Sequence, residues 1–286
     1  MQKVSLTKKI LLAITVSIIL AYQLLLIYVD DKLASRAFPN LYQSCHKIWS
    51  ARGLYNQRSE QNAISSMNRA FANGAKGAEV DFHYDIEMNR YIISHNHPER
   101  GADGKLVYPE KDGEILTLNK FLARLNDGSH FWLDYKNLDK LTDQQTQTAI
   151  ERLLEITEQN NIRDRLYIEG SNPIKLSRYT NAGFKTILGI HPLKEKNILA
   201  SLTMNLYKIG FSYFNISALA MAYGEVDNPI YSQQAIQILG PIPVFLFHVP
   251  DDAKTLNQLM AMDKVRTILV GVDQSINRFG INHCKL

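Results

Sequence analysis

Short apolar segments with the period of a β-strand alternate with amphipathic segments along residues 47–270. This alternation predicts a parallel sheet covered by helices, because parallel neighbours are joined by helical crossovers. The helical pattern is clearest at Asp143–Asn160 and Ala253–Met262. The expected strands are Lys47–Ala51, Ala78–Phe82, Tyr91–Ser94, Phe131–Lys136, Leu166–Glu169, Phe184–Ile190, Phe211–Ile216, Val244–His248 and Arg266–Val270.

The length of the chain beyond its first segment limits the choice of architecture. Residues 45–286 match the usual size of one eight-stranded barrel, about 250 residues. We therefore expect the α/β class, with a (β/α)8 TIM-type barrel over residues 45–286 preceded by one N-terminal transmembrane helix. Residues 30–44 are expected to be a linker, in which Pro39 limits helix extension.

The segment Ile10–Val29 contains no charged residue. At about 1.5 Å per residue it is long enough to cross a bilayer core of roughly 30 Å. Lys3, Lys8 and Lys9 precede it, so the positive-inside rule predicts a cytoplasmic N-terminus, residues 1–9, and a barrel outside the cytoplasm. A cleaved signal peptide is the alternative, although the stretch Leu24–Asp31 offers no good cleavage site.

Charge and cysteine content exclude some classes of function. Most of the net charge of +4 comes from residues 1–37, and the nearly neutral remainder gives no support for nucleic-acid binding. The two cysteines, Cys45 and Cys284, bracket the predicted barrel. A disulfide between them is chemically reasonable in an exported domain, and two unpaired thiols are the alternative. Neither has metal-ligand-like neighbours, so a zinc site is not expected.

Two acidic residues interrupt the predicted strand Ala78–Phe82. Glu79 and Asp81 are two positions apart, so both carboxylates point to the same side of the strand. Two buried like charges repel and lose hydration, and a divalent cation relieves both effects. Oxygen-only ligation favours Mg²⁺ or Ca²⁺. The alternative is an edge strand with a solvated acidic face.

Several short motifs occur in an order that resembles the glycerophosphodiester phosphodiesterase family of phospholipase-C-like barrels, which is related to sphingomyelinase D. The resemblance extends over roughly residues 45–275 and is strongest between Arg52 and His97. The matching residues are Arg52-Gly53, Gln61-Asn62, Gly74-Ala75, Glu79-x-Asp81, His95-Asn96, Asp134 and Lys136. The resemblance implies a cation held by Glu79, Asp81 and Asp134. It also implies phosphate contacts from Arg52 and Lys136, and proton transfer by His95.

The chain departs from the family pattern at one catalytic position. The family has a histidine immediately before the residue matching Arg52, and this chain has Ala51. That histidine shares the acid and base roles with the one matching His95, and loss of one partner of such a pair lowers the rate by orders of magnitude. His83 shares the strand face of Glu79 and Asp81 and is a candidate replacement. His97, on the loop after His95, is a second candidate.

The expected function is metal-dependent phosphodiester hydrolysis by a membrane-tethered enzyme that acts on glycerophosphodiesters or lysophospholipid headgroups. The alternatives are a catalytically impaired barrel that binds a phosphate-bearing ligand and an inert envelope scaffold. The expected location is a single-pass membrane protein with its barrel on the periplasmic or extracellular side. Further candidates at the rim of the barrel are Glu169, Asn215 and His248.

Overall fold

A computed structural model describes residues 6–38, 41–102, 104–272 and 276–280. Within these ranges, eight parallel strands close into a barrel, and the chain has the predicted (β/α)8 TIM-type fold. Closure is made by β1, which pairs with β2 through Ala51 and Glu79 and with β13 through Trp49 and Leu269. The barrel strands are β1 (Ile48–Ala51), β2 (Gly77–Asp85), β6 (His130–Tyr135), β7 (Leu166–Gly170), β8 (Lys185–Gly189), β9 (Ala218–Ala222), β12 (Val244–Val249) and β13 (Val265–Val270).

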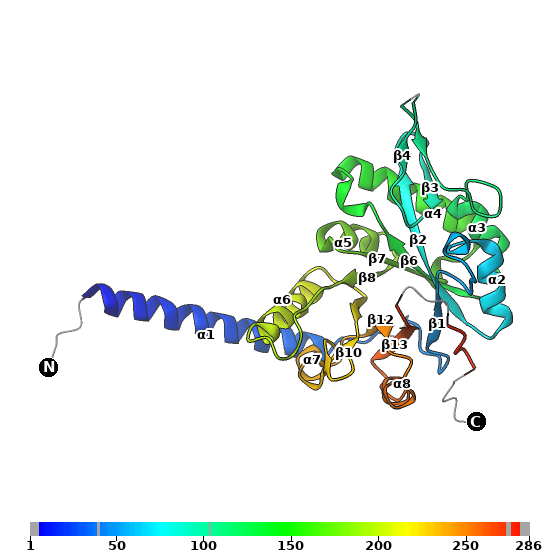
Figure 1. The fold of residues 1–286 in the computed structure, drawn as a ribbon. Coiled ribbons are helices and arrows are strands. Elements are labelled where there is room, and N and C mark those ends of the chain that lie inside the picture. The colour runs from blue at the N-terminus through cyan, green and yellow to red at the C-terminus, as the bar shows by residue number, and fades with distance from the viewer. Residues whose placement is uncertain (1–5, 39–40, 103, 273–275, 281–286) are drawn as a thin grey trace.

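Helices surround this barrel, and one long helix projects from it (Figure 1). The projecting helix, α1 (Leu6–Ala34), is long and apolar enough to cross a membrane. The other helices are α2 (Ile64–Ala72), α3 (Leu118–Arg124), α4 (Asp143–Asn160), α5 (Pro173–Asn181), α6 (Ala200–Tyr213), α7 (Gln233–Leu239) and α8 (Ala253–Met260). Single 3-10 turns are η1 (Arg58–Glu60), η2 (Leu138–Lys140) and η3 (Arg163–Arg165).

Three short additions extend the barrel. β3 (Arg90–Ile93) pairs antiparallel with the end of β2, so the expected strand Tyr91–Ser94 forms but lies outside the parallel barrel. β4 (Glu99–Arg100) and β5 (Leu106–Val107) make one hairpin. β10 (Gly224–Glu225) and β11 (Asn228–Pro229) make another.

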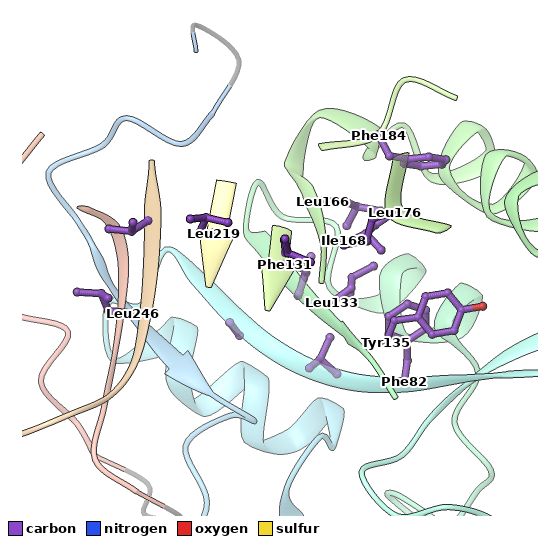
Figure 2. Packing of buried hydrophobic residues seen from close by; sticks show 14 of the residues in the cluster. Phe82, Phe131, Leu133, Tyr135, Leu166, Ile168, Leu176, Phe184, Leu219 and Leu246 are labelled. Carbon is purple, nitrogen blue, oxygen red and sulfur yellow. The ribbon is translucent and has the colours of Figure 1, made fainter. Parts of the chain in front are cut away.

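Successive side chains of each strand point to opposite faces, so the barrel has one core between strands and helices and another in its interior. On β6, Phe131, Leu133 and Tyr135 point outward and pack beneath the helices, as Figure 2 shows. The intervening Trp132 points into the barrel, where it packs with Tyr167 and Phe245. This aromatic layer fills the lower interior of the barrel, and polar residues occupy the end above it.

One predicted strand is wrong. Phe211–Ile216 was expected to be a strand, but residues up to Tyr213 end helix α6, and the strand is β9 (Ala218–Ala222). The apolar and aromatic residues of 211–216 suit the buried face of a helix equally well, and Phe211 is indeed buried. The sequence of β9, Ala-Leu-Ala-Met-Ala, lacks the β-branched residues typical of strands, so tertiary packing decides its structure.

Two further details refine the predictions. Helix α2 begins only at Ile64, because Asn62 adopts a positive φ of 63° just before it. The helix at Asp143–Asn160 has the expected bounds and starts with a capping box of Thr142 and Gln145. The predicted pairing of Cys45 with Cys284 stays a prediction, because Cys284 lies outside the described residues.

Candidate active site

Three carboxylates converge at the carboxyl end of the barrel. Glu79 and Asp81 lie on β2, and Asp134 lies on the neighbouring strand β6, directly opposite Asp81 in the register. One oxygen from each of the three lies within 4.8 Å of the others. The parallel register brings the three together, because inward-facing positions alternate on both strands. The three residues predicted to hold a cation therefore form one cluster.

Two basic side chains lie on this cluster. The Nε atom of Arg52 is 2.9 Å from Oδ2 of Asp81 and 3.8 Å from Glu79 Oε2. The Nζ atom of Lys136 is 2.7 Å from Oδ1 of Asp81 and also forms an ion pair with Asp134. All five of these side chains belong to strands of the barrel or follow one directly, so the scaffold fixes their positions.

The turn after β1 holds Arg52 in an unusual backbone conformation. Arg52 has a φ of 58° and Gly53 a φ of 90°. The amide of Arg52 donates to the carbonyl of Glu79, and the amide of Asn62 donates to the carbonyl of Arg52. A Cβ atom at Gly53 would lie 2.3 Å from the hydroxyl oxygen of Ser66, so only glycine fits. The Arg-Gly pair is thus explained by backbone geometry that directs the guanidinium group at the carboxylates.

Burial and charge separate the pKa values of the acidic groups. Burial raises the pKa of Glu79 well above its ordinary value, and the nearby charge of Asp81 adds to the effect. Burial also opposes ionisation of Asp81, but Lys136 and Arg52 outweigh it and hold its pKa below the ordinary value. Burial raises the pKa of Asp134, against the opposing charge of Lys136. The cluster is therefore an environment in which added positive charge is stabilising.

The donor set fits a hard divalent cation. It consists of carboxylate oxygens alone, which suit Mg²⁺ or Ca²⁺ and not the softer metals. Burial raises the pKa of Glu79 and of Asp134, and the charges of Arg52 and Lys136 offset this only in part. Glu79, Asp81 and Asp134 are therefore the residues that would hold the cation.

A cavity of about 400 Å³ opens beside the cluster. It is within the usual range for small-ligand sites, roughly 300–1,000 Å³. Its lining combines charged groups with aromatic and apolar groups. The charged residues are Arg52, Glu79, Asp134, Lys136 and Glu169, and the apolar and aromatic residues include Ala51, Tyr55, Trp132, Phe247 and Leu269.

The cavity also contains residues that the motifs did not identify. His191 follows β8 and lines the cavity together with the rim candidate His248, which has a φ of 52°. Glu169, another rim candidate, accepts a 2.6 Å hydrogen bond from the indole of Trp132. Burial, followed by the charge of Asp134, raises the pKa of Glu169 to about 8. His191 lies outside every recognised motif, and only its position after a barrel strand could have indicated it.

The three histidines predicted for proton transfer lie to one side of this cavity. His95 and His97 are exposed on the loop after β3, and His83 is buried on the extension of β2. The rings of His83 and His97 are 5.1 Å apart in an edge contact. Burial lowers the pKa of His83 to about 4. None of the three is among the described residues that line the cavity.

Ala51 and Asn215 lie at opposite ends of the barrel. Ala51 lines the cavity and lies beside Glu79 in the register of β1 and β2, so the position of the missing histidine is within the site. Asn215 follows the end of α6 with a φ of 55°, at the opposite end of the barrel from the carboxylates. The rim prediction for Asn215 is wrong, because the strand assigned to its segment is a helix.

Comparison with known proteins identifies the fold. No family model matches the chain, and no curated protein matches its sequence. Among solved structures, it is similar to a glycerophosphodiester phosphodiesterase from Parabacteroides distasonis, with a TM-score of 0.56 and 17% identity over 80% of this chain and 93% of that one. A glycerophosphodiester phosphodiesterase from Agrobacterium tumefaciens has a TM-score of 0.53 and 11% identity over 78% of this chain and 95% of that one. At these identities the likeness establishes a shared fold.

Proposed function

We propose that this chain is a metal-dependent phosphodiester hydrolase of the glycerophosphodiester phosphodiesterase type, tethered to a membrane by α1. One observation carries the proposal. Three carboxylates and two basic side chains lie together beside one cavity at the mouth of the barrel. They are Glu79, Asp81, Asp134, Arg52 and Lys136. We define the mouth as the end of the barrel where its strands have their carboxyl ends. The fold shared with enzymes of that activity supports the same conclusion.

Each residue of the cluster has a distinct role in this proposal. The three carboxylates would hold Mg²⁺ or Ca²⁺, and the bound cation would supply positive charge that polarises phosphoryl oxygens and offsets the charge of the transition state. Arg52 and Lys136 bind the remaining phosphoryl oxygens, and the planar guanidinium group can do so at two points. Asn62 positions Asp81 through two hydrogen bonds. These groups are fixed before the substrate binds, which is the arrangement that stabilises developing charge best.

The transferred proton needs a donor and an acceptor. His95 remains the candidate that protonates the leaving alcohol, since it carries the match to the family motif, and His83 and His97 remain candidates for the base. Ala51 leaves open space in the cavity where the family has an imidazole. A hydroxyl of the substrate adjacent to phosphorus can take the place of water as the attacking group and yield a cyclic product. The substrate class consists of glycerophosphodiesters and lysophospholipid headgroups.

The membrane attachment follows from α1. This helix spans Leu6–Ala34, and positively charged Lys8 and Lys9 lie at its beginning. With the positive end in the cytoplasm, the barrel lies on the extracytoplasmic side.

The test uses the full chain in nanodiscs with a panel of glycerophosphodiesters and lysophospholipids. Released alcohol and phosphate species are measured with Mg²⁺, with Ca²⁺ and with a chelator, for the parent and for Glu79→Ala. Glu99→Ala, on the exposed hairpin strand β4, is the control. The proposal expects cation-dependent turnover in the parent and the control and none in Glu79→Ala. Cation binding without turnover of any member of the panel would indicate a binding protein.

A further inference from the structure

The membrane helix packs against α6 in a defined direction. Asp30 on α1 forms a 2.7 Å ion pair with Lys208 on α6. One turn of α6 further on, the carbonyl of Ser212 accepts a 2.9 Å hydrogen bond from Lys32, and the carbonyl of Ile216 accepts one from Arg36. In these three contacts the residue numbers increase together along both segments. The two helices therefore run in the same direction.

The direction of α6 is set by the barrel. α6 follows β8 and precedes β9, so it begins at the mouth of the barrel and ends at the opposite end. Because α1 runs parallel to α6, the N-terminal half of α1 leaves the barrel on the side of the mouth. Figure 1 shows this half projecting away from the barrel past α6.

The point at which α1 leaves the protein surface can be located along the helix. Counting back eight residues from Asp30 and Lys208, about 12 Å at 1.5 Å per residue, leads to Tyr22 on α1 and to Ala200, the first residue of α6. The hydroxyl of Tyr22 is buried, whereas every residue from Leu6 to Ala21 is exposed. The exposed apolar surface of α1 thus extends past the mouth, and it continues beside the first half of α6, where Leu24, Ile27 and Tyr28 are exposed.

The protein surface beside this point exposes several large aliphatic side chains. The loop before α6 and the first half of α6 expose five large aliphatic side chains, and Ile198 is 95% exposed. The two neighbouring connections at the same end of the barrel each add one more, on α5 and on the β10–β11 hairpin. These residues are Leu193, Ile198, Leu199, Leu202 and Leu206, with Ile174 and Val226 on the neighbouring connections. We call this set the rim patch.

We propose that the rim patch inserts into the surface of the bilayer from which α1 emerges, so that the mouth of the barrel faces the lipid headgroups. Continuity with α1 identifies the occupant, because the lipid that surrounds the exposed half of α1 begins where the rim patch lies. Aliphatic side chains at an interface gain free energy by leaving water for the boundary of the acyl chains. An exposed patch of this kind is typical of a binding surface.

This placement selects a substrate class, and that step rests on the proposed function. A mouth held against the bilayer receives phosphodiester headgroups of lipids in that leaflet by lateral movement. A soluble diester has to enter between the rim and the membrane. The chemical class we infer is therefore a phosphodiester lipid of the same membrane, and a lysophospholipid is its simplest representative.

The first experiment locates the rim patch relative to lipid. Ile198→Trp is introduced into the full chain in nanodiscs, and Tyr213→Trp is the control, at a 78% exposed position on the same helix but at its other end. The native Trp49 and Trp132 are both buried and give a constant background. Brominated lipids should quench the emission of Ile198→Trp and leave that of Tyr213→Trp unchanged. No quenching of Ile198→Trp, equal quenching of both, or a disc occupied by two copies in contact through this face would overturn the proposal.

The second experiment tests the substrate class. Ile198→Ser combined with Leu202→Ser is compared with Tyr213→Ser, after thermal unfolding shows that both variants are folded. The double variant should lose at least about tenfold in turnover of a lysophospholipid in the disc, because withdrawing even one aliphatic side chain from lipid costs about that factor. Its turnover of a soluble glycerophosphodiester should be no lower than that of the parent. An equal effect on both substrates would contradict the lipid assignment. A parent inactive on both would refute the proposed function, while the quenching result would still decide the docking.

Discussion

Asn62 and Asp81 are joined by two hydrogen bonds. The side-chain amide of Asn62 donates to Oδ2 of Asp81 at 2.8 Å, and the backbone amide of Asp81 donates to Oδ1 of Asn62 at 3.1 Å. Asn62 lies on the connection between β1 and α2, and Asp81 is on β2, so this pair ties the first connection of the barrel to the cation cluster. Both residues are buried, and the pair fixes the orientation of the Asp81 carboxylate.

Substitution Asn62→Ala should lower cation affinity about 10- to 100-fold, the usual effect of losing a partner of a metal ligand. Asn137→Ala is the matched control, because Asn137 makes the same two-point contact with the backbone of Tyr84, further along β2. The control should lose roughly 1 kcal/mol of stability and keep its cation affinity. Calorimetric titration of Ca²⁺ and Mg²⁺ measures both variants. Equal losses of affinity would show that Asn62 acts only through general stability.

Substitution of Lys136 should affect cation affinity and turnover in different ways. Its ammonium group contacts Asp81 and Asp134, so Lys136→Met should leave the carboxylates less neutralised and keep or increase cation affinity. Turnover should fall by about 10²- to 10³-fold, because a group that binds the charged phosphoryl oxygens is lost. Cation titration and steady-state kinetics on the same preparation measure the two effects. A variant that loses cation affinity and turnover together would contradict this division of roles.

Position 51 tests whether the missing histidine limits the rate. Ala51 lines the cavity beside Glu79, so an imidazole placed there enters the site. Ala51→His should raise turnover by about 10²-fold or more, the typical contribution of a positioned acid or base. Ala51→Gln, which adds a polar side chain without a group that titrates near neutral pH, should not. A rate unchanged by histidine would mean that another residue already performs its role.

His130 should make stability depend on pH. Its ring packs against Tyr42 and Trp49 at the amino end of the barrel, and burial, together with Arg165, lowers its pKa from 6.5 to about 4. Between these values the unfolded chain binds a proton that the folded chain does not, so stability falls as the pH drops from 6.5 towards 4.

The variant His130→Phe should remove part of this dependence, because the pKa of His83 is also lowered to about 4 and contributes in the same direction. Denaturant unfolding of the full chain at pH 7 and pH 5 measures the difference for the parent and the variant. A parent with the same stability at both values would contradict the assignment.

The architecture was predictable because it depends on patterns that the chain repeats. Strand and helix periods alternate along the barrel, and the carboxylates of Glu79 and Asp81 interrupt one strand at its inward positions. Asp134 was added to this pair by the resemblance to the family, and in the register of β2 and β6 it lies opposite Asp81. The prediction failed at Phe211–Ile216, where a buried helical face and a buried strand have the same composition.

Side chains that meet only through the closed barrel could not be located from the sequence. His191 joins the cavity from the end of β8, the fifth barrel strand along the chain, and no local pattern marks it. The exposure of Ile198 and the direction of α1 along α6 also depend on tertiary packing. An apolar loop in a sequence can be buried or exposed, and only the assembled fold distinguishes the two.

The most direct test of the central claim is ³¹P NMR of a glycerophosphodiester mixed with the full chain in nanodiscs. The spectrum is followed as a chelator and then Ca²⁺ or Mg²⁺ is added. The account predicts that the diester signal is replaced by product with a cation present, that the chelator stops the reaction, and that Asp134→Asn abolishes it. Persistence of the diester with a cation bound, or turnover that neither the chelator nor Asp134→Asn changes, would contradict the account.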